Sequence, residues 1–285
     1  MIRLSALDRQ LAELQISELP SIQHVQQKQQ EMLQLLRRSQ TDPISYVGLE
    51  YCTPEHCARA NCSEACWFGT LRRRVPQVLA IRRLMDQLDG PLHKIIVHKV
   101  DWGCPYRWLY WVKPKTAKSL MTRVFNSMLS ISVTAVGTFK VYPFGTGHDL
   151  YFSEIHMIAG GADERQLQTA FLPVQRDASV RISKVDDAND VIDEVTECNS
   201  PRLWEPRGDP AGPVHLTEFY AWLAKMKIGA RIFRYGCDEN FDLITYRKIR
   251  YNPRIKKKRS GRRRYYKRRK WQPIRPWSDM SYYDD

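Results

Sequence analysis

Four cysteines lie close together in the first quarter of the chain, with a spacing that suits metal ligands. Cys52, Cys57, Cys62 and Cys66 fall within fifteen residues and are separated by four, four and three residues. Four thiolates are enough for a closed tetrahedral zinc site, although the two-residue spacing of the commonest zinc fingers is absent. We expect these cysteines to bind one structural Zn²⁺, with His56 as the substitute ligand if one cysteine is idle. The alternative is a set of buried free thiols.

Three consecutive arginines, Arg72, Arg73 and Arg74, follow the cysteine cluster. Arginines held on a rigid zinc subdomain can contact phosphates at a lower entropic cost than arginines in a loose chain. We therefore expect them to bind nucleic acid. The alternative is the solvated start of a helix.

Glu154 and His156 form a second candidate metal site. They lie two residues apart in a run that reads as a strand, so both side chains are expected on the same face of a sheet. A carboxylate with an imidazole suits Mg²⁺ or Mn²⁺ in an open site, where the ion would polarise a phosphate. His148 would join them if the intervening turn folds back. The alternative is an ordinary surface or core placement.

The end of the chain carries most of the net positive charge. The net charge is +14, and residues 250–270 hold 13 Lys or Arg and no Asp or Glu, so the rest of the chain is nearly neutral. Such a segment cannot pack into a core, and we expect it to be disordered until it binds a partner. Cations neutralise phosphates, and tyrosine rings stack on unpaired bases. The expected nucleic-acid contacts are Arg254, Lys256, Lys257, Lys258, Arg259, Arg262, Arg263, Arg264, Tyr265, Tyr266, Lys267, Arg268, Arg269 and Lys270. The alternatives are a solubilising tail and a nuclear-localisation signal.

The hydrophobic pattern predicts four segments that position these residues. Residues 1–42 read as a helical N-terminal segment interrupted at Pro20, which either packs on the body or forms a coiled-coil contact with a partner or a second copy. Residues 43–90 form the zinc-binding subdomain and its helix, residues 91–249 an α+β domain, and residues 250–285 the basic arm.

The α+β domain is predicted from the order of its elements. Strands are expected at 93–100, 131–141, 149–159, 179–185 and 231–235, and helices at 115–128, 163–171, 186–197 and 216–227. The order strand, helix, strand, strand, helix, strand predicts an antiparallel sheet with its helices on one face.

The run from Cys52 to Cys198 resembles the HUH endonucleases, which initiate rolling-circle replication. An arginine-rich cysteine cluster precedes the sheet domain. One strand contains Val136-Gly137-Thr138-Phe139, and the next carries a histidine and ends in Gly160-Gly161. The family has His, an apolar residue and His where this chain has Glu154-Ile155-His156, so the first ligand is replaced. The resemblance implies a DNA-nicking domain with a divalent metal.

The resemblance also implies a tyrosine nucleophile, which would attack a phosphodiester of single-stranded DNA and leave a 5′-phosphotyrosine. The family carries this tyrosine, followed by a lysine, on a helix after the metal strand, but residues 190–197 contain no tyrosine. The candidates elsewhere are Tyr220 with Lys225, and Tyr110 with Lys113.

These features together predict a DNA-binding replication initiation protein of the rolling-circle type, from a plasmid or phage, that acts on single-stranded or origin DNA. The alternative is a non-catalytic nucleic-acid-binding protein or a viral genome-packaging protein with a basic arm. The sequence has no run of about 18 apolar residues, and its start is charged too early for a signal peptide. We therefore expect no membrane association and a location in the cytoplasm or nucleoid, or in the nucleus for a eukaryotic or viral protein.

Overall fold

The structure is a computed structural model. It describes residues 22–38, 47–53, 57, 62–88, 90–128, 132–143, 150–187, 191–192, 195–196, 213–227 and 229–238. Residues 1–246 cluster as one compact unit and residues 247–285 as a second. The first half of the predicted N-terminal helical segment and the whole basic arm, residues 250–285, lie outside the described residues.

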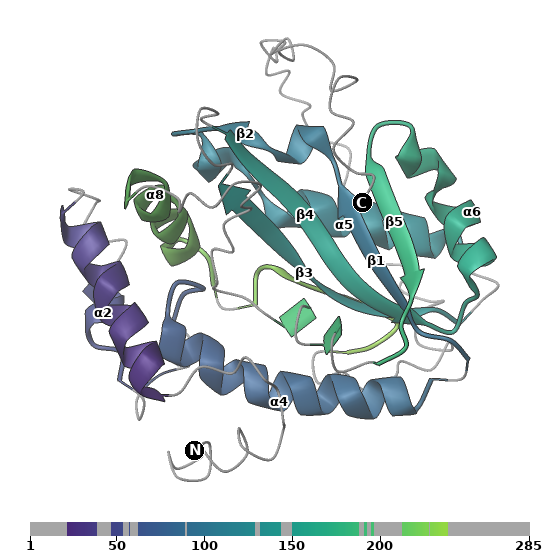
Figure 1. The fold of residues 1–285 in the computed structure, drawn as a ribbon, viewed down its shortest axis with the longest axis horizontal. Coiled ribbons are helices and arrows are strands. Elements are labelled where there is room, and N and C mark those ends of the chain that lie inside the picture. The colour runs from purple at the N-terminus through teal and green to yellow at the C-terminus, as the bar shows by residue number, and fades with distance from the viewer. Residues whose placement is uncertain are drawn as a thin grey trace, which may run out of the picture. The chain divides into compact units, whose positions relative to one another are not determined.

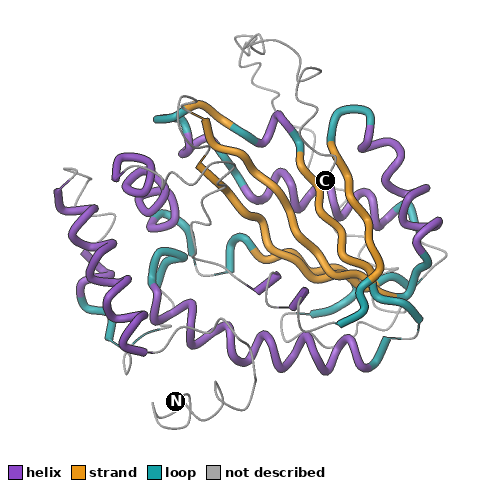
Figure 2. The backbone as a smooth tube through the Cα atoms, in the orientation of Figure 1, coloured by secondary structure: helices purple, strands orange, loops and turns teal. Residues whose placement is uncertain are grey.

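An antiparallel sheet forms the centre of the first unit (Figures 1 and 2). In the described part of the chain it has six strands. Five of them follow the order β5-β1-β4-β3-β6, and the sixth, the short β2, pairs with the first residues of β4. The strands are β1 (His93–His98), β2 (Cys104–Pro105), β3 (Thr134–Pro143), β4 (Leu150–Gly160), β5 (Ser179–Lys184) and β6 (Ile232–Tyr235). The predicted α+β class and antiparallel sheet are thus confirmed.

The helices are α2 (Ile22–Arg38), α3 (Val47–Glu50), α4 (Trp67–Asp86), α5 (Pro114–Asn126), α6 (Glu164–Gln175) and α8 (Pro213–Ala224), with short 3₁₀ turns η2 (Val100–Trp102) and η3 (Leu109–Trp111). α4 begins directly after Cys66, which caps its first turn, and so includes Arg72, Arg73 and Arg74. No helix in the described ranges is long and apolar enough to cross a membrane.

α5 and α6 cover the apolar face of the sheet. Alternation along the strands places Ile95, Ile155 and Phe139 on this face, and all three are buried. Phe125 of α5 packs edge-on against Phe171 of α6, with 5.9 Å between the ring centroids. The two helices that connect the strands therefore pack on the same face of the sheet, as the order of elements predicted, and Figure 1 shows α5 behind the strands and α6 beside β5.

The opposite face of the sheet is more polar. Its neighbouring strands present Lys94 and His98 of β1, Glu154 and His156 of β4, and Arg181 of β5. Part of this face is covered, because the Thr138 hydroxyl donates a hydrogen bond to the Val195 carbonyl. Residues from the predicted helix 186–197 thus contact the face opposite α5 and α6, which differs from the expectation that all helices share one face.

A glycine turn directs the chain from β4 into α6. Gly161 has a φ of 80°, and a Cβ at this position would collide with the Ser132 carbonyl oxygen. Asp163 then caps α6, because its side chain accepts from Gln166 N (2.8 Å) while the Gln166 side chain accepts from Asp163 N (2.9 Å). The glycine pair noted in the sequence therefore serves the turn into this helix.

Candidate metal centre and polar sheet face

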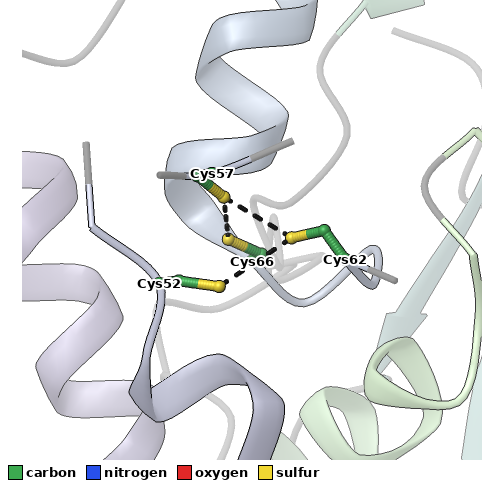
Figure 3. A group of neighbouring side chains, drawn as sticks. All are labelled: Cys52, Cys57, Cys62 and Cys66. Atoms are coloured by element: carbon green, nitrogen blue, oxygen red, sulfur yellow. Dashed lines mark hydrogen bonds between the residues drawn. The ribbon is translucent and has the colours of Figure 1, made fainter. Parts of the chain in front are cut away.

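The four cysteines predicted as metal ligands converge in the structure (Figure 3). Their sulfur atoms all lie within 4.8 Å of one another. The Cys57–Cys66, Cys57–Cys62 and Cys52–Cys62 Sγ pairs are 2.9, 3.5 and 3.9 Å apart. In a tetrahedral zinc site with Zn–S bonds of about 2.3 Å, neighbouring sulfurs are about 3.8 Å apart. The cluster therefore has the donor set and nearly the size of such a site.

Helix ends position two of these ligands. Cys66 is the N-cap of α4, and its Sγ accepts a hydrogen bond from Gly69 N at 3.2 Å. Cys52 follows α3, and its backbone N–H donates to the Leu49 carbonyl at 3.2 Å. The N-terminus of a helix stabilises negative charge, so α4 favours the thiolate form of Cys66 that a metal requires.

The packing of four thiols in one place changes their acidity. Hydrogen bonding to neighbouring cysteines, Cys52 first, raises the pKa of Cys57 and of Cys66, and burial raises both further. Hydrogen bonding to Cys57 lowers the pKa of Cys52. The cluster alone therefore resists full ionisation, and a divalent cation would offset the repulsion among four thiolates.

Gln29 ties α2 to the two segments that carry Cys52 and Cys66. This side chain is buried within the apolar stripe of α2, where Val25, Met32 and Leu36 are also buried. Its Nε2 donates to the Leu49 carbonyl at 3.1 Å, and its Oε1 accepts from Trp67 N at 3.0 Å. Both ends of the amide are satisfied, so α2 holds α3 against the start of α4.

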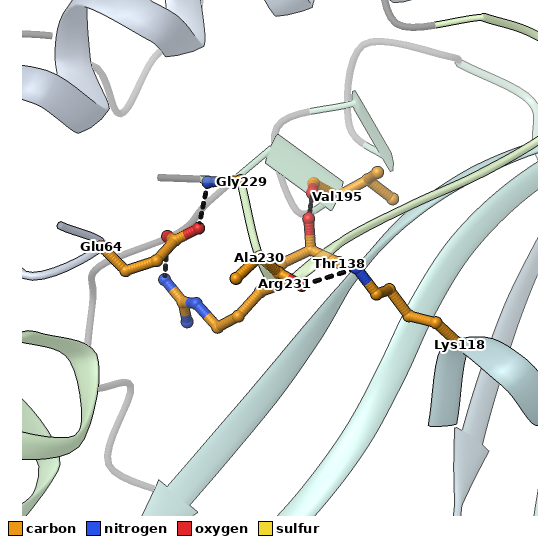
Figure 4. A network of polar contacts seen from close by, with 7 residues as sticks. All are labelled: Glu64, Lys118, Thr138, Val195, Gly229, Ala230 and Arg231. Carbon is orange, nitrogen blue, oxygen red and sulfur yellow. Dashed lines mark hydrogen bonds and ion pairs between the residues drawn. The ribbon is translucent and has the colours of Figure 1, made fainter. Parts of the chain in front are cut away.

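The loop between Cys62 and Cys66 is attached to the strand β6 by a buried carboxylate (Figure 4). Glu64 and Arg231 are 3% and 2% exposed, and Glu64 Oε2 lies 3.3 Å from Arg231 Nη2. The other carboxylate oxygen accepts from Gly229 N, and Glu64 N donates to the Met226 carbonyl at 2.9 Å. The cysteine cluster is therefore joined directly to the edge of the sheet.

The remaining residues predicted near the cluster have different placements. His56 lies outside the described residues, as do the side chains of Arg72 and Arg73, whose backbones lie in α4. Arg74 is buried, and its Nε donates to Thr196 Oγ1 at 3.3 Å. This placement differs from the expected phosphate contact, because α4 turns Arg74 towards the residues packed on the sheet.

Glu154 and His156 share the polar face of the sheet, as their spacing predicted. Glu154 Oε2 lies 2.8 Å from His156 Nε2, and His98 Nδ1 of β1 lies 3.7 Å from Glu154 Oε1. Burial would raise the pKa of Glu154, but the hydrogen bond to His156 and the nearby cations lower it overall. Burial lowers the pKa of His98. The site is an ionised carboxylate between two imidazoles.

A tyrosine that the sequence did not single out lies at this site. The Tyr142 hydroxyl of β3 is 3.5 Å from His156 Nε2. Lys140, two residues earlier on β3, is the register partner of Glu154. His98 and Tyr142 belong to the neighbouring strands β1 and β3, so only the register of the sheet brings them to Glu154. The sequence signal that could have indicated these two residues is that they are polar side chains within otherwise apolar strands.

The tyrosines predicted as nucleophiles lie elsewhere. Tyr220 is buried in α8 against the ring of Phe219, and burial raises its pKa to about 12. Lys225 is exposed just beyond α8. Tyr110 and Lys113 are exposed in and after η3. Among the contacts of the described residues, none joins these side chains to Glu154 or His156.

Within the described ranges, the four cysteines are the only group of three or more Cys, His, Asp or Glu side chains close enough to share one ion. Comparison with protein-family models, with curated proteins and with solved structures finds no match for this chain.

Proposed function

We propose that this chain is a nucleic-acid-binding protein of the rolling-circle initiator type, which binds single-stranded DNA on the polar face of its sheet and cleaves it through Tyr142. One observation carries the proposal, which is that the Tyr142 hydroxyl, His156 and Glu154 form a chain of side chains on that face. A nucleophile that is connected through an imidazole to a carboxylate has a route for its proton to a base, which covalent catalysis requires.

Each residue has a definite role in the proposed reaction. The Tyr142 oxygen attacks the phosphorus atom, and its proton passes to the hydrogen-bonded pair of His156 and Glu154, whose Nε2 atom lies 3.5 Å from the hydroxyl. The bond between phosphorus and O3′ breaks, a 5′-phosphotyrosine forms, and the departing O3′ takes a proton from water to become a 3′-hydroxyl. Glu154 Oε2 lies 2.8 Å from the same nitrogen, so His156 gives its own Nε2 proton to Glu154 as it receives the proton of Tyr142, and the carboxylate is the final base.

The predicted Mg²⁺ or Mn²⁺ at Glu154 and His156 stays a prediction. Such an ion takes one or two protein carboxylates together with phosphate oxygens, and it would polarise the attacked phosphate when bound. The direct contact between Glu154 and His156 favours a proton-transfer pair instead. The two readings differ in one measurable respect, because cleavage by the pair persists in EDTA whereas cleavage by a metal site stops.

The four-cysteine centre supports a structural role in the same proposal. We infer that it binds Zn²⁺, because its donors are four thiols whose sulfur atoms are about as far apart as those of a tetrahedral zinc site. The metal would hold α3, the start of α4 and the loop of Glu64 together at the edge of the sheet. Its contribution is to fix the DNA-binding face, and it takes no part in the chemistry.

The test is covalent capture of labelled single-stranded DNA, analysed by denaturing electrophoresis with and without Mn²⁺ or EDTA. We expect an adduct with the wild type and none with Tyr142→Phe, while His156→Ala should slow its formation at least about 100-fold. Tyr220→Phe and Tyr110→Phe test the two tyrosines predicted from the sequence. An adduct that survives in Tyr142→Phe and disappears in either of the other variants would contradict the proposed nucleophile.

A non-catalytic nucleic-acid-binding protein is the second candidate. The observation in its favour is that Glu154 and His156 already satisfy each other at 2.8 Å, as residues of a purely structural network do. This candidate predicts binding of single-stranded DNA without any adduct or nick from the wild type. Capture of DNA without cleavage would therefore assign the polar face to binding alone.

A further inference from the structure

Three aromatic rings are exposed on the loop that joins β2 to α5. Trp108, Tyr110 and Trp111 are 53%, 56% and 58% exposed, although large aromatic side chains normally contribute to a core. The rings of Trp108 and Trp111 are nearly parallel, at 23°, with centroids 6.5 Å apart. Tyr110 lies against Trp111 with centroids 5.3 Å apart. We call residues 106–111 the aromatic loop.

The aromatic loop is held in place by a carboxylate beneath it. Glu218 of α8 accepts hydrogen bonds from Arg107 N at 2.8 Å and from Leu109 N at 2.9 Å. The Tyr151 hydroxyl lies 3.0 Å from the same carboxylate, and burial, followed by the charge of Glu218, raises the pKa of Tyr151 so that it remains protonated. These bonds sustain the left-handed backbone of Arg107, whose φ is 68°.

Two further contacts make the loop a rigid support. Leu109, the first residue of η3, is fully buried and anchors the loop in the core. The indole N–H of Trp222 donates to the Val112 carbonyl at 3.1 Å. The exposed rings are thus fixed before any ligand arrives, so binding to them costs little conformational entropy.

The charge around the loop identifies the class of partner. The sequence from Trp102 to His148 contains no Asp or Glu. Arg107, Lys113 and Lys115 are exposed beside the rings, and the Arg107 guanidinium lies over the Tyr106 ring at 5.5 Å. Exposed rings among cations, in a segment whose own sequence has no acidic residue, suit a ligand that has flat unpaired bases and phosphates.

We propose that the aromatic loop is a stacking site for the unpaired bases of single-stranded DNA, with Arg107, Lys113 and Lys115 at its phosphates. The proposal rests on the proposed nucleic-acid binding and adds a second contact to it. β2 pairs with Tyr151 of β4, three residues from Glu154, which is a distance of about 10 Å along the strand. The loop therefore lies near the start of the strand that carries Glu154, although the side chains of Tyr151 and Glu154 point to opposite faces of the sheet.

The test compares the full-length wild type with Trp108→Ala and Trp111→Ala, by fluorescence anisotropy of a labelled oligothymidylate and of a duplex. Each alanine should weaken oligothymidylate binding about 5- to 100-fold, because one stacked base is lost. Duplex affinity should not change, because paired bases are inaccessible to the rings. The dependence on salt should also remain, because no charge is removed.

Leu172→Ala is the matched control, because Leu172 is 57% exposed on α6, away from the loop. Trp111→Phe, which keeps a ring, should bind more tightly than Trp111→Ala. Unchanged oligothymidylate binding in both alanine variants would overturn the stacking site and assign the rings to a protein partner, while leaving DNA binding by the arm and sheet intact. A wild type that binds neither the oligothymidylate nor the duplex would overturn the stacking site and the proposed function together.

Discussion

Cys66 has two roles in this structure, because its thiol belongs to the four-cysteine cluster and also caps α4. The Gly69 N–H that bonds to its Sγ is one of the donors that the first turn of a helix leaves without a partner. Loss of the sulfur would therefore affect a metal site and a helix end at once. Cys104, by contrast, is a half-buried cysteine outside the cluster.

The first prediction concerns metal content. The purified protein should contain about one zinc per chain, because four converging thiols form one closed site. Cys66→Ser should lose the zinc and unfold more readily, whereas Cys104→Ser should keep it. Elemental analysis and thermal unfolding of the three proteins measure these effects. A wild type without metal, with all four thiols open to alkylation, would contradict the prediction.

The second prediction concerns the pH dependence of stability at Glu154. The pKa of Glu154 is lowered from its ordinary value of 4.5, so its carboxylate stabilises the fold above pH 4.5. This contribution is lost as the pH falls through the lowered pKa. The free energy of unfolding in urea should therefore fall more steeply in the wild type than in Glu154→Gln as the pH is lowered from about 5. Parallel curves for the wild type and Glu154→Gln would show that the fold does not favour the ionised form of Glu154.

At the scale of elements, the ion pair of Glu64 and Arg231 is the principal link between the cysteine loop and the sheet. Both residues are almost completely buried, and Glu64 also binds the backbone at Gly229. Lys118 of α5 donates to the carbonyls of Ala230 and Ile232, at 2.6 and 3.1 Å, and so holds the same segment from its other side. The start of β6 is thus held by two separate elements, the cysteine loop and α5.

The third prediction follows from the cost of leaving one charge of a buried pair alone. Glu64→Gln should lower the free energy of unfolding by about 3 kcal/mol or more, because Arg231 would stay buried without its carboxylate. The double variant with Arg231→Met should recover part of that loss. The exposed pair of Lys28 and Glu31 is the comparison, and Glu31→Gln should cost at most about 1 kcal/mol. Equal losses from Glu64→Gln and Glu31→Gln would contradict this account.

At the scale of the whole molecule, the net positive charge is concentrated in a different segment of the chain from the described helices and strands. Residues 250–270 carry 13 of the 45 basic residues, and they belong to the second of the two units, residues 247–285. The first unit contains the four-cysteine cluster, the polar sheet face and the aromatic loop. Electrostatic attraction by the arm and selective contacts by the body are therefore expected to be separable functions.

The fourth prediction tests this separation by truncation at Tyr251. The truncated protein should keep its thermal stability but lose most of its affinity for duplex DNA. Each phosphate contact contributes about 0.9 to the slope of log affinity against log salt, so that slope should flatten by several units. Affinities measured over a range of salt concentrations provide the test, and an unchanged slope would show that the arm does not contact the DNA backbone.

The sequence by itself determined the features that depend on local spacing. The cysteines converge because short loops connect them, and Glu154 and His156 share a face because side chains alternate along a strand. The periodic spacing of hydrophobic residues likewise predicted the strands and helices of the sheet domain. The N-terminal segment and the basic arm stay predictions from composition.

Only the tertiary structure decided which distant residues meet. His98 and Tyr142 reach Glu154 and His156 through the order and register of β1, β4 and β3, which no local pattern specifies. Arg74 is buried, and Glu218 supports a loop more than 100 residues away, because packing satisfies polar groups across the whole core. Local spacing fixes the direction of a side chain, whereas its neighbours depend on the free energy of packing the complete chain.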